Sequence, residues 1–324
     1  MTSLVLGGIM AVAQAGLTGG FVQAESETKP LDLPGKVVFQ TDREAREHHG
    51  IFLLKDGQMS RIVDGAFPKL TRDGRKLLYK GGGGHSVKVL DLVTLQTETL
   101  DWTEVYAPYD YDLSPDGKWL AFTSHHVHQS KRVEPQSNLM VARIDGSEVK
   151  QLTDAPVGIY GPRWSPDGTR VLFYSGLDPH SDSDRTPGGI YLADPRTESV
   201  WKLDLDDAMK AGGGSWLPDG HRIVFSGDGE NSVDQIYLFS IESKQTTQLT
   251  KNAHADWRYM AVTPSPDGKQ ILFVSARKGD PAIGQALYVI NIDGTDERQV
   301  TPTQGIKKYG RTRWSTDFNP DWAP

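Results

Sequence analysis

Three histidines lie close together in the segment His125-His126-Val127-His128. In an extended segment the side chains of His126 and His128 point to the same side, and imidazole is a common ligand of zinc and manganese. These histidines are therefore the candidate metal ligands, and a divalent cation is the cofactor that they would hold. The alternative is that they are ordinary exposed loop residues and that the protein needs no cofactor.

A second candidate site consists of aromatic and basic residues in the long connecting segments. Aromatic and arginine side chains dominate the hot spots of binding surfaces. Each of these residues can instead wedge neighbouring elements together, so the argument rests on the set. The expected binding residues are Tyr106, Tyr109, Tyr111, Tyr160, Trp257, Arg258, Tyr259, Lys308, Tyr309 and Arg311.

Motifs of the common enzyme classes do not occur in the sequence. It contains no phosphate-binding loop, no His-Glu-x-x-His, no dinucleotide fingerprint and no Gly-x-Ser-x-Gly. It has no cysteine, which excludes thiolate nucleophiles and cysteine-bound zinc, and its net charge of −7 argues against nucleic-acid binding. We therefore expect a non-enzymatic binding protein. The alternative is a carbohydrate-active lyase or hydrolase that uses a metal ion or carboxylates on the same surface.

A turn followed by an apolar strand recurs five times, as in SPDGKWLAFTS at residues 114–124. Proline, aspartate and glycine are the residues that a tight turn prefers, so the turn aspartates are expected to be structural. Successive copies are 43 to 52 residues apart, which is the length of a four-stranded propeller blade. The five turn aspartates are Asp73, Asp116, Asp167, Asp219 and Asp267.

A sixth copy is divided between the two ends of the chain. The segment 314–317 is expected to supply its inner strand and turn, and residues 35–42 the strand that follows. Pairing of these segments closes the ring and removes free sheet edges. The sequence therefore predicts an all-β, six-bladed β-propeller with four antiparallel strands per blade over residues 35–324. Its long loops emerge on one face, where they form an aromatic and basic rim.

One polar residue stands on each expected inner strand, four residues before the turn aspartate. Side chains there lie near the propeller axis, where walls of low dielectric strengthen their electric field. The cations either pair locally, with Asp112 or with rim acids such as Asp110, or receive a carboxylate or phosphate group from a ligand. The six residues are Lys69, Asp112, Arg163, Ser215, Thr263 and Arg313, of which Lys69, Asp112, Arg163 and Arg313 are the candidate channel residues.

The first 24 residues carry no charged side chain and end in Val22-Gln23-Ala24, a pattern typical of a cleaved signal peptide. We expect residues 1–24 to be this signal, residues 25–34 a linker, and the mature protein periplasmic or secreted. No second apolar stretch is long enough to span a membrane. The expected partner is an envelope protein or a glycan, not a nucleic acid, and the protein is expected to be a monomer.

The Ser-Pro-Asp-Gly turns with their apolar strands, and IDGTDERQVT at residues 292–301, resemble the repeats of TolB-type β-propellers. The resemblance covers residues 35–322. It implies a propeller fold and a role like that of TolB in the periplasmic Tol–Pal system. Tricorn and dipeptidyl-peptidase-type proteases share the repeat, as does oligogalacturonate lyase, which implies manganese bound by histidines. Only residues 25–34 separate the expected cleavage site from the first strand, so this sequence is expected to lack the amino-terminal domain of TolB.

Overall fold

The computed structural model describes residues 31–44, 49–81, 85–124, 137–154, 158–177, 187–206, 211–229, 234–251, 257–277, 285–302, 305–308, 311–314 and 317–324. For residues 177, 187, 257–258, 276–277, 305–308 and 311–314 it describes the backbone alone. The expected signal peptide lies outside these residues. So do His125, His126, His128 and Tyr309.

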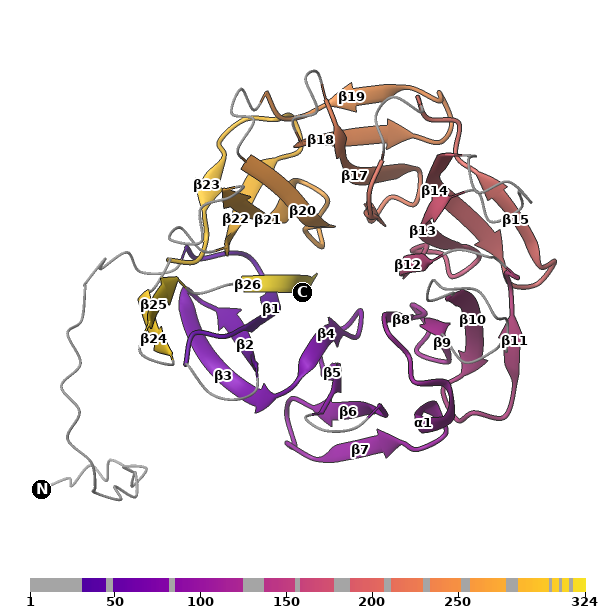
Figure 1. Cartoon of the computed structure of the whole chain (residues 1–324), viewed down its shortest axis with the longest axis horizontal. Coiled ribbons are helices and arrows are strands. Elements are labelled where there is room, and N and C mark those ends of the chain that lie inside the picture. The colour runs from indigo at the N-terminus through magenta and orange to yellow at the C-terminus, as the bar shows by residue number, and fades with distance from the viewer. Residues whose placement is uncertain are drawn as a thin grey trace, which may run out of the picture.

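The described residues form six four-stranded antiparallel sheets arranged around a central axis (Figure 1). Blade 1 contains β4 (Ala66–Leu70), β5 (Lys76–Lys80), β6 (Val87–Asp91) and β7 (Thr97–Leu100). Blade 2 contains β8 (Tyr111–Leu113), β9 (Trp119–Ser124), β10 (Asn138–Arg143) and β11 (Val149–Gln151). Blade 3 contains β12 (Ile159–Trp164), β13 (Val171–Leu177), β14 (Pro187–Asp194) and β15 (Ser199–Lys202).

The next two blades have the same order from the axis outward. Blade 4 contains β16 (Gly214–Trp216), β17 (Arg222–Asp228), β18 (Asp234–Ser240) and β19 (Thr246–Gln248). Blade 5 contains β20 (Trp257–Pro264), β21 (Gln270–Arg277), β22 (Gln285–Asn291) and β23 (Arg298–Gln299). The short helix α1 (Thr103–Tyr106) lies between blades 1 and 2. The six-bladed propeller predicted from the sequence is confirmed.

Blade 6 joins the two ends of the sequence, as predicted. Its inner strand is β26 (Asp317–Ala323), which pairs with β1 (Lys36–Thr41) and is followed by β2 (Gly50–Lys55) and β3 (Gln58–Asp64). The predicted identity of the inner strand was wrong. Residues Arg311–Trp314 form β25, which pairs with β24 (Gly305–Lys308) in a separate hairpin. Trp314 is therefore the last residue of β25, and the true inner strand begins only at Asp317.

The repeated turns are held by hydrogen bonds that their own residues supply. In blade 2, Ser114 Oγ donates to Asp116 Oδ1 at 2.6 Å, and the backbone N–H of Lys118 donates to the same oxygen at 3.0 Å. Gly117 adopts a positive φ of 71°, a conformation that costs glycine least. The turn aspartates are thus structural, as predicted.

Apolar residues fill the spaces between neighbouring blades. In blade 2, Leu120, Ala121 and Phe122 are all fully buried, because both faces of the second strand pack against other blades. Aromatic pairs add to this packing, such as Phe173 and Tyr191, whose rings are stacked 5.5 Å apart. The mutual covering of blade faces makes the ring one continuous packed body.

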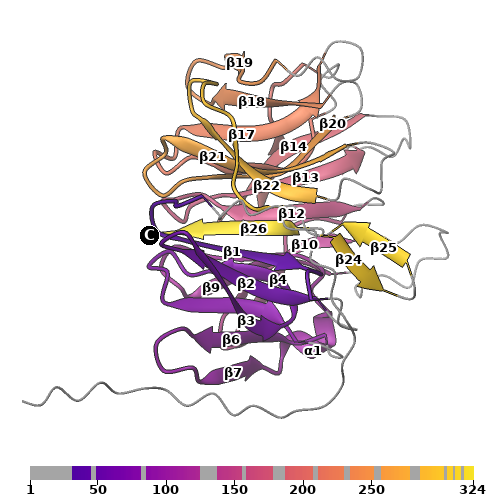
Figure 2. The ribbon, with the colours of Figure 1, turned by 90° about the vertical axis from the view of Figure 1, so that its left-hand side faces the viewer.

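The two faces of the ring carry different connections. The Ser-Pro-Asp-Gly turns and the end of β26 lie on one face, here called the turn face. The opposite face, here called the loop face, carries α1 and the β24–β25 hairpin (Figure 2). Among the described residues, no helix is long and apolar enough to cross a membrane.

Candidate functional site

Each inner strand places one polar residue at the same register position beside the second strand of its blade. These pairs are Lys69 with Leu78, Asp112 with Ala121, Arg163 with Leu172, Ser215 with Val224, Thr263 with Leu272, and Asp321 with Val38. We call the six polar residues Lys69, Asp112, Arg163, Ser215, Thr263 and Asp321 the channel ring. Asp321 takes the place that the sequence had suggested for Arg313, whose backbone lies in the β24–β25 hairpin.

A β-bulge in several inner strands turns the following residues toward the axis. The register shifts between Ala66 and Lys69 and between Met260 and Thr263. Within these shifts Phe67 and Ala261 adopt positive φ values of 53° and 52°, which are uncommon for residues with a side chain. A bulge re-aims the side chains beside it, which explains how a short strand can present a ring residue to the channel.

Four members of the channel ring hold the next blade in place. The backbone N–H of Trp164 donates to Asp112 Oδ2 at 2.7 Å, and that of Leu70 donates to Asp321 Oδ2 at 2.6 Å. Ser215 and Thr263 donate to backbone carbonyls of the next inner strand, Ser215 at 2.8 Å and Thr263 at 3.3 Å. These bonds give the anionic and hydroxyl members of the ring a structural role.

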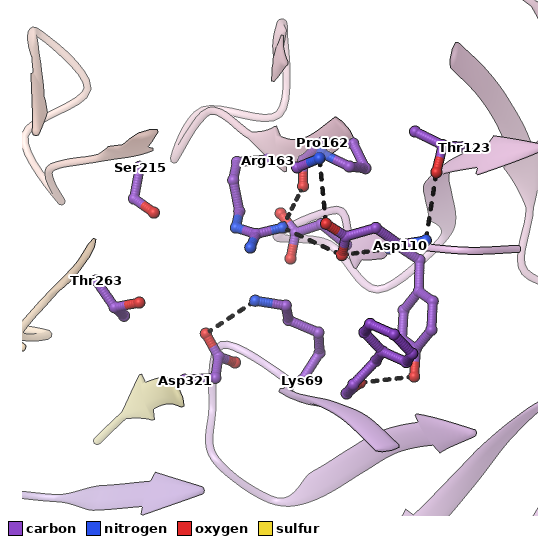
Figure 3. A network of polar contacts seen from close by, with 12 residues as sticks. Lys69, Asp110, Thr123, Pro162, Arg163, Ser215, Thr263 and Asp321 are labelled. Carbon is purple, nitrogen blue, oxygen red and sulfur yellow. Dashed lines mark hydrogen bonds and ion pairs between the residues drawn. The ribbon is translucent and has the colours of Figure 1, made fainter. Parts of the chain in front are cut away.

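The two cations of the ring are only loosely paired (Figure 3). Lys69 Nζ lies 3.8 Å from Asp321 Oδ1. Arg163 Nη1 lies 3.7 Å from Asp110 Oδ1 and donates to the carbonyl of Pro162 at 2.7 Å. Both ionic distances exceed the range of a hydrogen bond. The charges attract one another, but their donor groups are not saturated by these carboxylates.

Asp112 is the ring member whose charge changes near neutral pH. Burial raises the pKa of its carboxyl from 3.8 to about 6, and Arg163 and Lys69 oppose this effect while Asp321 adds to it. Burial lowers the pKa of Arg163, but the attraction of Asp110, Asp112 and Asp321 outweighs burial and raises it overall. The ring therefore places Lys69 and Arg163 beside a carboxyl group that can take up a proton.

A cavity of about 430 Å³ opens from the channel ring to the turn face. We call it the funnel. Asp112, Arg163, Ser215, Thr263 and Asp321 line it, and its walls include the turn prolines Pro115, Pro166, Pro218 and Pro266. Blade 1 has Arg72 where the other turns have proline, and Arg72 Nη1 donates to the carbonyl of Pro166 on blade 3 at 2.5 Å. One cation therefore reaches across the mouth of the funnel.

On the loop face, two of the predicted binding tyrosines are exposed next to each other. The side chains of Tyr109 and Tyr160 are 48% and 40% exposed. Their strands are linked because the backbone N–H of Gly161 donates to Asp110 Oδ2 at 3.1 Å. The ring of Tyr109 lies 5.6 Å from that of Phe67, which extends the aromatic surface to blade 1.

The other predicted tyrosines with described side chains pack between the blades of the propeller. Tyr111 is fully buried and donates to the carbonyl of Phe67 at 2.7 Å. Tyr259 is buried against Phe273, with ring centroids 5.1 Å apart, and Tyr106 packs against Phe122 at 5.8 Å.

Several predicted binding residues lie beyond what the structure describes at the level of side chains. The backbones of Trp257 and Arg258 lie in β20, and those of Lys308 and Arg311 in the β24–β25 hairpin. Their side chains fall outside the described part of the chain, as does Tyr309 entirely. The histidine cluster is outside it too, and among the described residues no group of three metal-binding side chains comes together.

The sequence interpretation missed Asp321 and Arg72. A signal for Asp321 was present, because ring residues are followed by tryptophan in Arg163-Trp164 and Ser215-Trp216. Both Arg313-Trp314 and Asp321-Trp322 match that signal, and the chain uses the second. Arg72 is visible as the residue that replaces proline in the first repeated turn. Asp110, which the sequence suggested as a local partner of the channel cations, lies 3.7 Å from Arg163 Nη1.

Comparison with known proteins agrees with this architecture. A family model described as the TolB beta propeller domain matches residues 125–319. The uncharacterized peptidase YuxL of Bacillus subtilis is 30% identical over 231 residues, which are 68% of this chain and 31% of the relative. Dipeptidyl-peptidase 5 of Aspergillus fumigatus is 30% identical over 51% of this chain and 24% of its own length. The chain thus spans less than a third of these curated relatives.

Solved structures show the same fold at low sequence identity. TolB from Acinetobacter baumannii superposes with a TM-score of 0.69 at 20% identity, covering 91% of this chain and 68% of that one. An oligogalacturonate lyase in complex with manganese gives a TM-score of 0.59 at 16% identity, covering 87% and 85%. The family model covers more than half of the sequence, and the chain belongs to the TolB beta propeller domain family.

Proposed function

We propose that this protein is a non-enzymatic propeller that binds a protein partner through the loop-face mouth of its channel. The observation that carries this proposal is the pair of exposed tyrosines, Tyr109 and Tyr160, on adjacent blades. Large aromatic side chains that remain exposed beside a rigid channel are typical of binding hot spots.

The relatives named peptidases support a role in handling polypeptides. The matched region is less than a third of their length, so the propeller accounts for only part of each relative. We infer that in this chain the propeller supplies recognition of a polypeptide and not the chemistry.

The uncharged segment 1–24 supports export to the periplasm or beyond. Export predicts Glu25 as the first residue of the recovered protein, and recovery of an intact Met1 would contradict it.

The binding proposal is tested with a double variant, Tyr109→Ser with Tyr160→Ser. The variant and the wild-type protein are immobilised, and the proteins that each retains from an envelope extract are quantified. Trp201→Ser is the matched control, because Trp201 is also an exposed aromatic residue but lies on the outer strand β15. We expect the double variant to lose proteins that the wild type and the control both retain.

Thermal unfolding must show that all three proteins are equally folded. Equal retention by the wild type and the double variant would contradict the proposal.

A further inference from the structure

The two cations of the channel ring donate few hydrogen bonds to other described residues. Lys69 donates no hydrogen bond to any described residue, although its side chain is only 6% exposed. Arg163 donates only from Nη1 in the described part of the chain. Asp112 and Asp321 each already accept a backbone N–H with one oxygen. The remaining donors of the two cations are therefore open to a further acceptor group.

The two cations are placed to share one acceptor group. Lys69 comes from blade 1 and Arg163 from blade 3, and Figure 3 shows their charged ends directed toward the same space in the centre of the ring. Ser215 and Thr263 approach that space from the other side. A carboxylate has two oxygens in one plane, a shape that the guanidinium group matches.

The funnel gives access to this space from the turn face only through an opening surrounded by blades. Residues of all six blades line it, which suits a ligand group that enters along the propeller axis. Its volume of about 430 Å³ falls within the range of small-ligand pockets. The proline rings of its walls offer apolar contact to short aliphatic side chains.

We propose that the carboxyl-terminal carboxylate of a peptide binds at the base of the funnel to Arg163, which lines the funnel, and to the neighbouring Lys69 of the channel ring, with the last side chains of the peptide against the proline walls. This site is on the opposite face from the tyrosine surface and does not depend on it. The ligand differs in kind from a glycan, because the recognised group is the free end of a chain.

Binding of an anion here is coupled to the protonation of Asp112. The groups that face Asp112 are Arg163 on β12, Lys69 on β4 and Asp321 on β26, with the backbone N–H of Trp164. A bound carboxylate adds negative charge beside Asp112 and favours its protonated form. Affinity is therefore expected to fall as pH rises through 6, while the ligand carboxylate stays ionised throughout.

The test is equilibrium dialysis of the full protein against a pool of N-acetylated tripeptides with all residue types at each position. A second pool has the same sequences with carboxamide ends, and mass spectrometry measures what is retained at pH 5 and pH 8. We expect retention of free carboxylates and not of amides, stronger at pH 5, and weaker when salt is raised. Equal retention of both pools, or retention of neither, would overturn the proposal.

Variants locate the site within the chain. Arg163→Met and Lys69→Met should each weaken retention about tenfold or more, because each removes charge-assisted hydrogen bonds. The matched controls Arg196→Met and Lys269→Met remove exposed cations of the turn-face loops and should leave retention unchanged. Asp112→Asn should abolish the pH dependence and bind at pH 8 as the wild type binds at pH 5.

Asp112→Asn keeps the proposal falsifiable if the cation variants fold poorly, because it should improve binding at pH 8. An Asp112→Asn protein with unchanged pH dependence would count against the proposal. Galacturonate and inorganic phosphate are dialysed in parallel. Retention of either without retention of free-acid tripeptides would overturn the assignment to a peptide. The double tyrosine variant should bind the tripeptides normally. This result distinguishes a failure of the funnel proposal from a failure of the proposal for the tyrosine surface.

Discussion

Two ionic clusters of the propeller, one buried and one partly exposed, use the same residue types in different ways. At the closure of the ring, Arg43 binds Asp317 through two nitrogens, and their side chains are 4% and 0% exposed. Arg43 also donates to the carbonyl of Pro302 at 2.6 Å, and Thr301 donates to Asp317 at 2.6 Å. In this closing cluster, three donated hydrogen bonds satisfy the guanidinium and three accepted ones satisfy the carboxylate.

The channel ring has charges of both signs but lacks this fit. Its ionic distances are 3.7 and 3.8 Å, and it opens into the funnel. A buried ion pair stabilises a fold only when its geometry is good and its remaining groups are satisfied. The closing cluster meets this condition and joins residues from the two ends of the chain. The channel ring does not, and the proposed ligand site rests on this contrast.

Breaking the closing cluster should have the largest effect on stability. Arg43→Met leaves Asp317 as an uncompensated buried charge at the contact of β26 with the rest of blade 6. We expect a loss of about 3–5 kcal/mol in the free energy of unfolding, measured by urea titration. Arg196→Met, which removes an arginine that is 72% exposed, is the control and should cost little. A cost for Arg43→Met below that of this control would show that the closing cluster is not structural.

Asp112→Asn should change the pH dependence of stability by a smaller amount. The folded-state pKa of Asp112 is raised to about 6 from 3.8, so the folded protein binds more protons than the unfolded chain between these values. The wild type therefore loses stability as pH rises from about 4 to 6, by at most about 3 kcal/mol. The asparagine variant should lack this slope.

Asp116→Asn should change the pH dependence of stability in the opposite direction, and it serves as the control for that experiment. The hydrogen bond from Ser114 and the effect of Lys118 lower the pKa of Asp116. Its contribution is present above its ordinary pKa and is lost as pH falls through the folded value. If the stability curves of Asp112→Asn and the wild type run parallel from pH 4 to 7, the pKa of Asp112 is not raised in the folded protein.

The repeat of the sequence was sufficient to predict the architecture. The spacing of the turn aspartates gave the number of blades, because every blade needs the same length of chain and the same turn. The position of the ring residues relative to Asp73, Asp116, Asp167, Asp219 and Asp267 was correct in all five blades that have the turn.

The prediction failed where the repeat ends. Blade 6 has no turn between β26 and β1, since these strands come from opposite ends of the chain, so nothing local fixes the register. Arg313-Trp314 and Asp321-Trp322 are then equivalent by sequence, and only the pairing of Val38 with Asp321 distinguishes them. The burial of Tyr111 and Tyr259 could not be predicted from the sequence either, because it depends on how neighbouring blades pack against each other.

Lys69→Met is the sharpest test of the contrast between the two clusters, because its effect on stability should be the smallest. Like Arg43, Lys69 is a nearly buried cation beside a carboxylate of β26. Its ion pair is long, however, and Asp321 keeps its hydrogen bond from the backbone of Leu70 when Lys69 is lost. We expect a cost of about 1 kcal/mol or less in the same urea titration that reports on Arg43→Met.

The same variant should raise the pKa of Asp112 further, since Lys69 is one of the two cations that lower it. The slope of stability with pH should therefore extend to higher pH in Lys69→Met than in the wild type. A cost as large as that of Arg43→Met would place Lys69 among the structural ion pairs and remove the distinction between the clusters. A small cost together with the extended slope would mean that the fold does not need the charge of Lys69, although the chain keeps that charge buried at the channel.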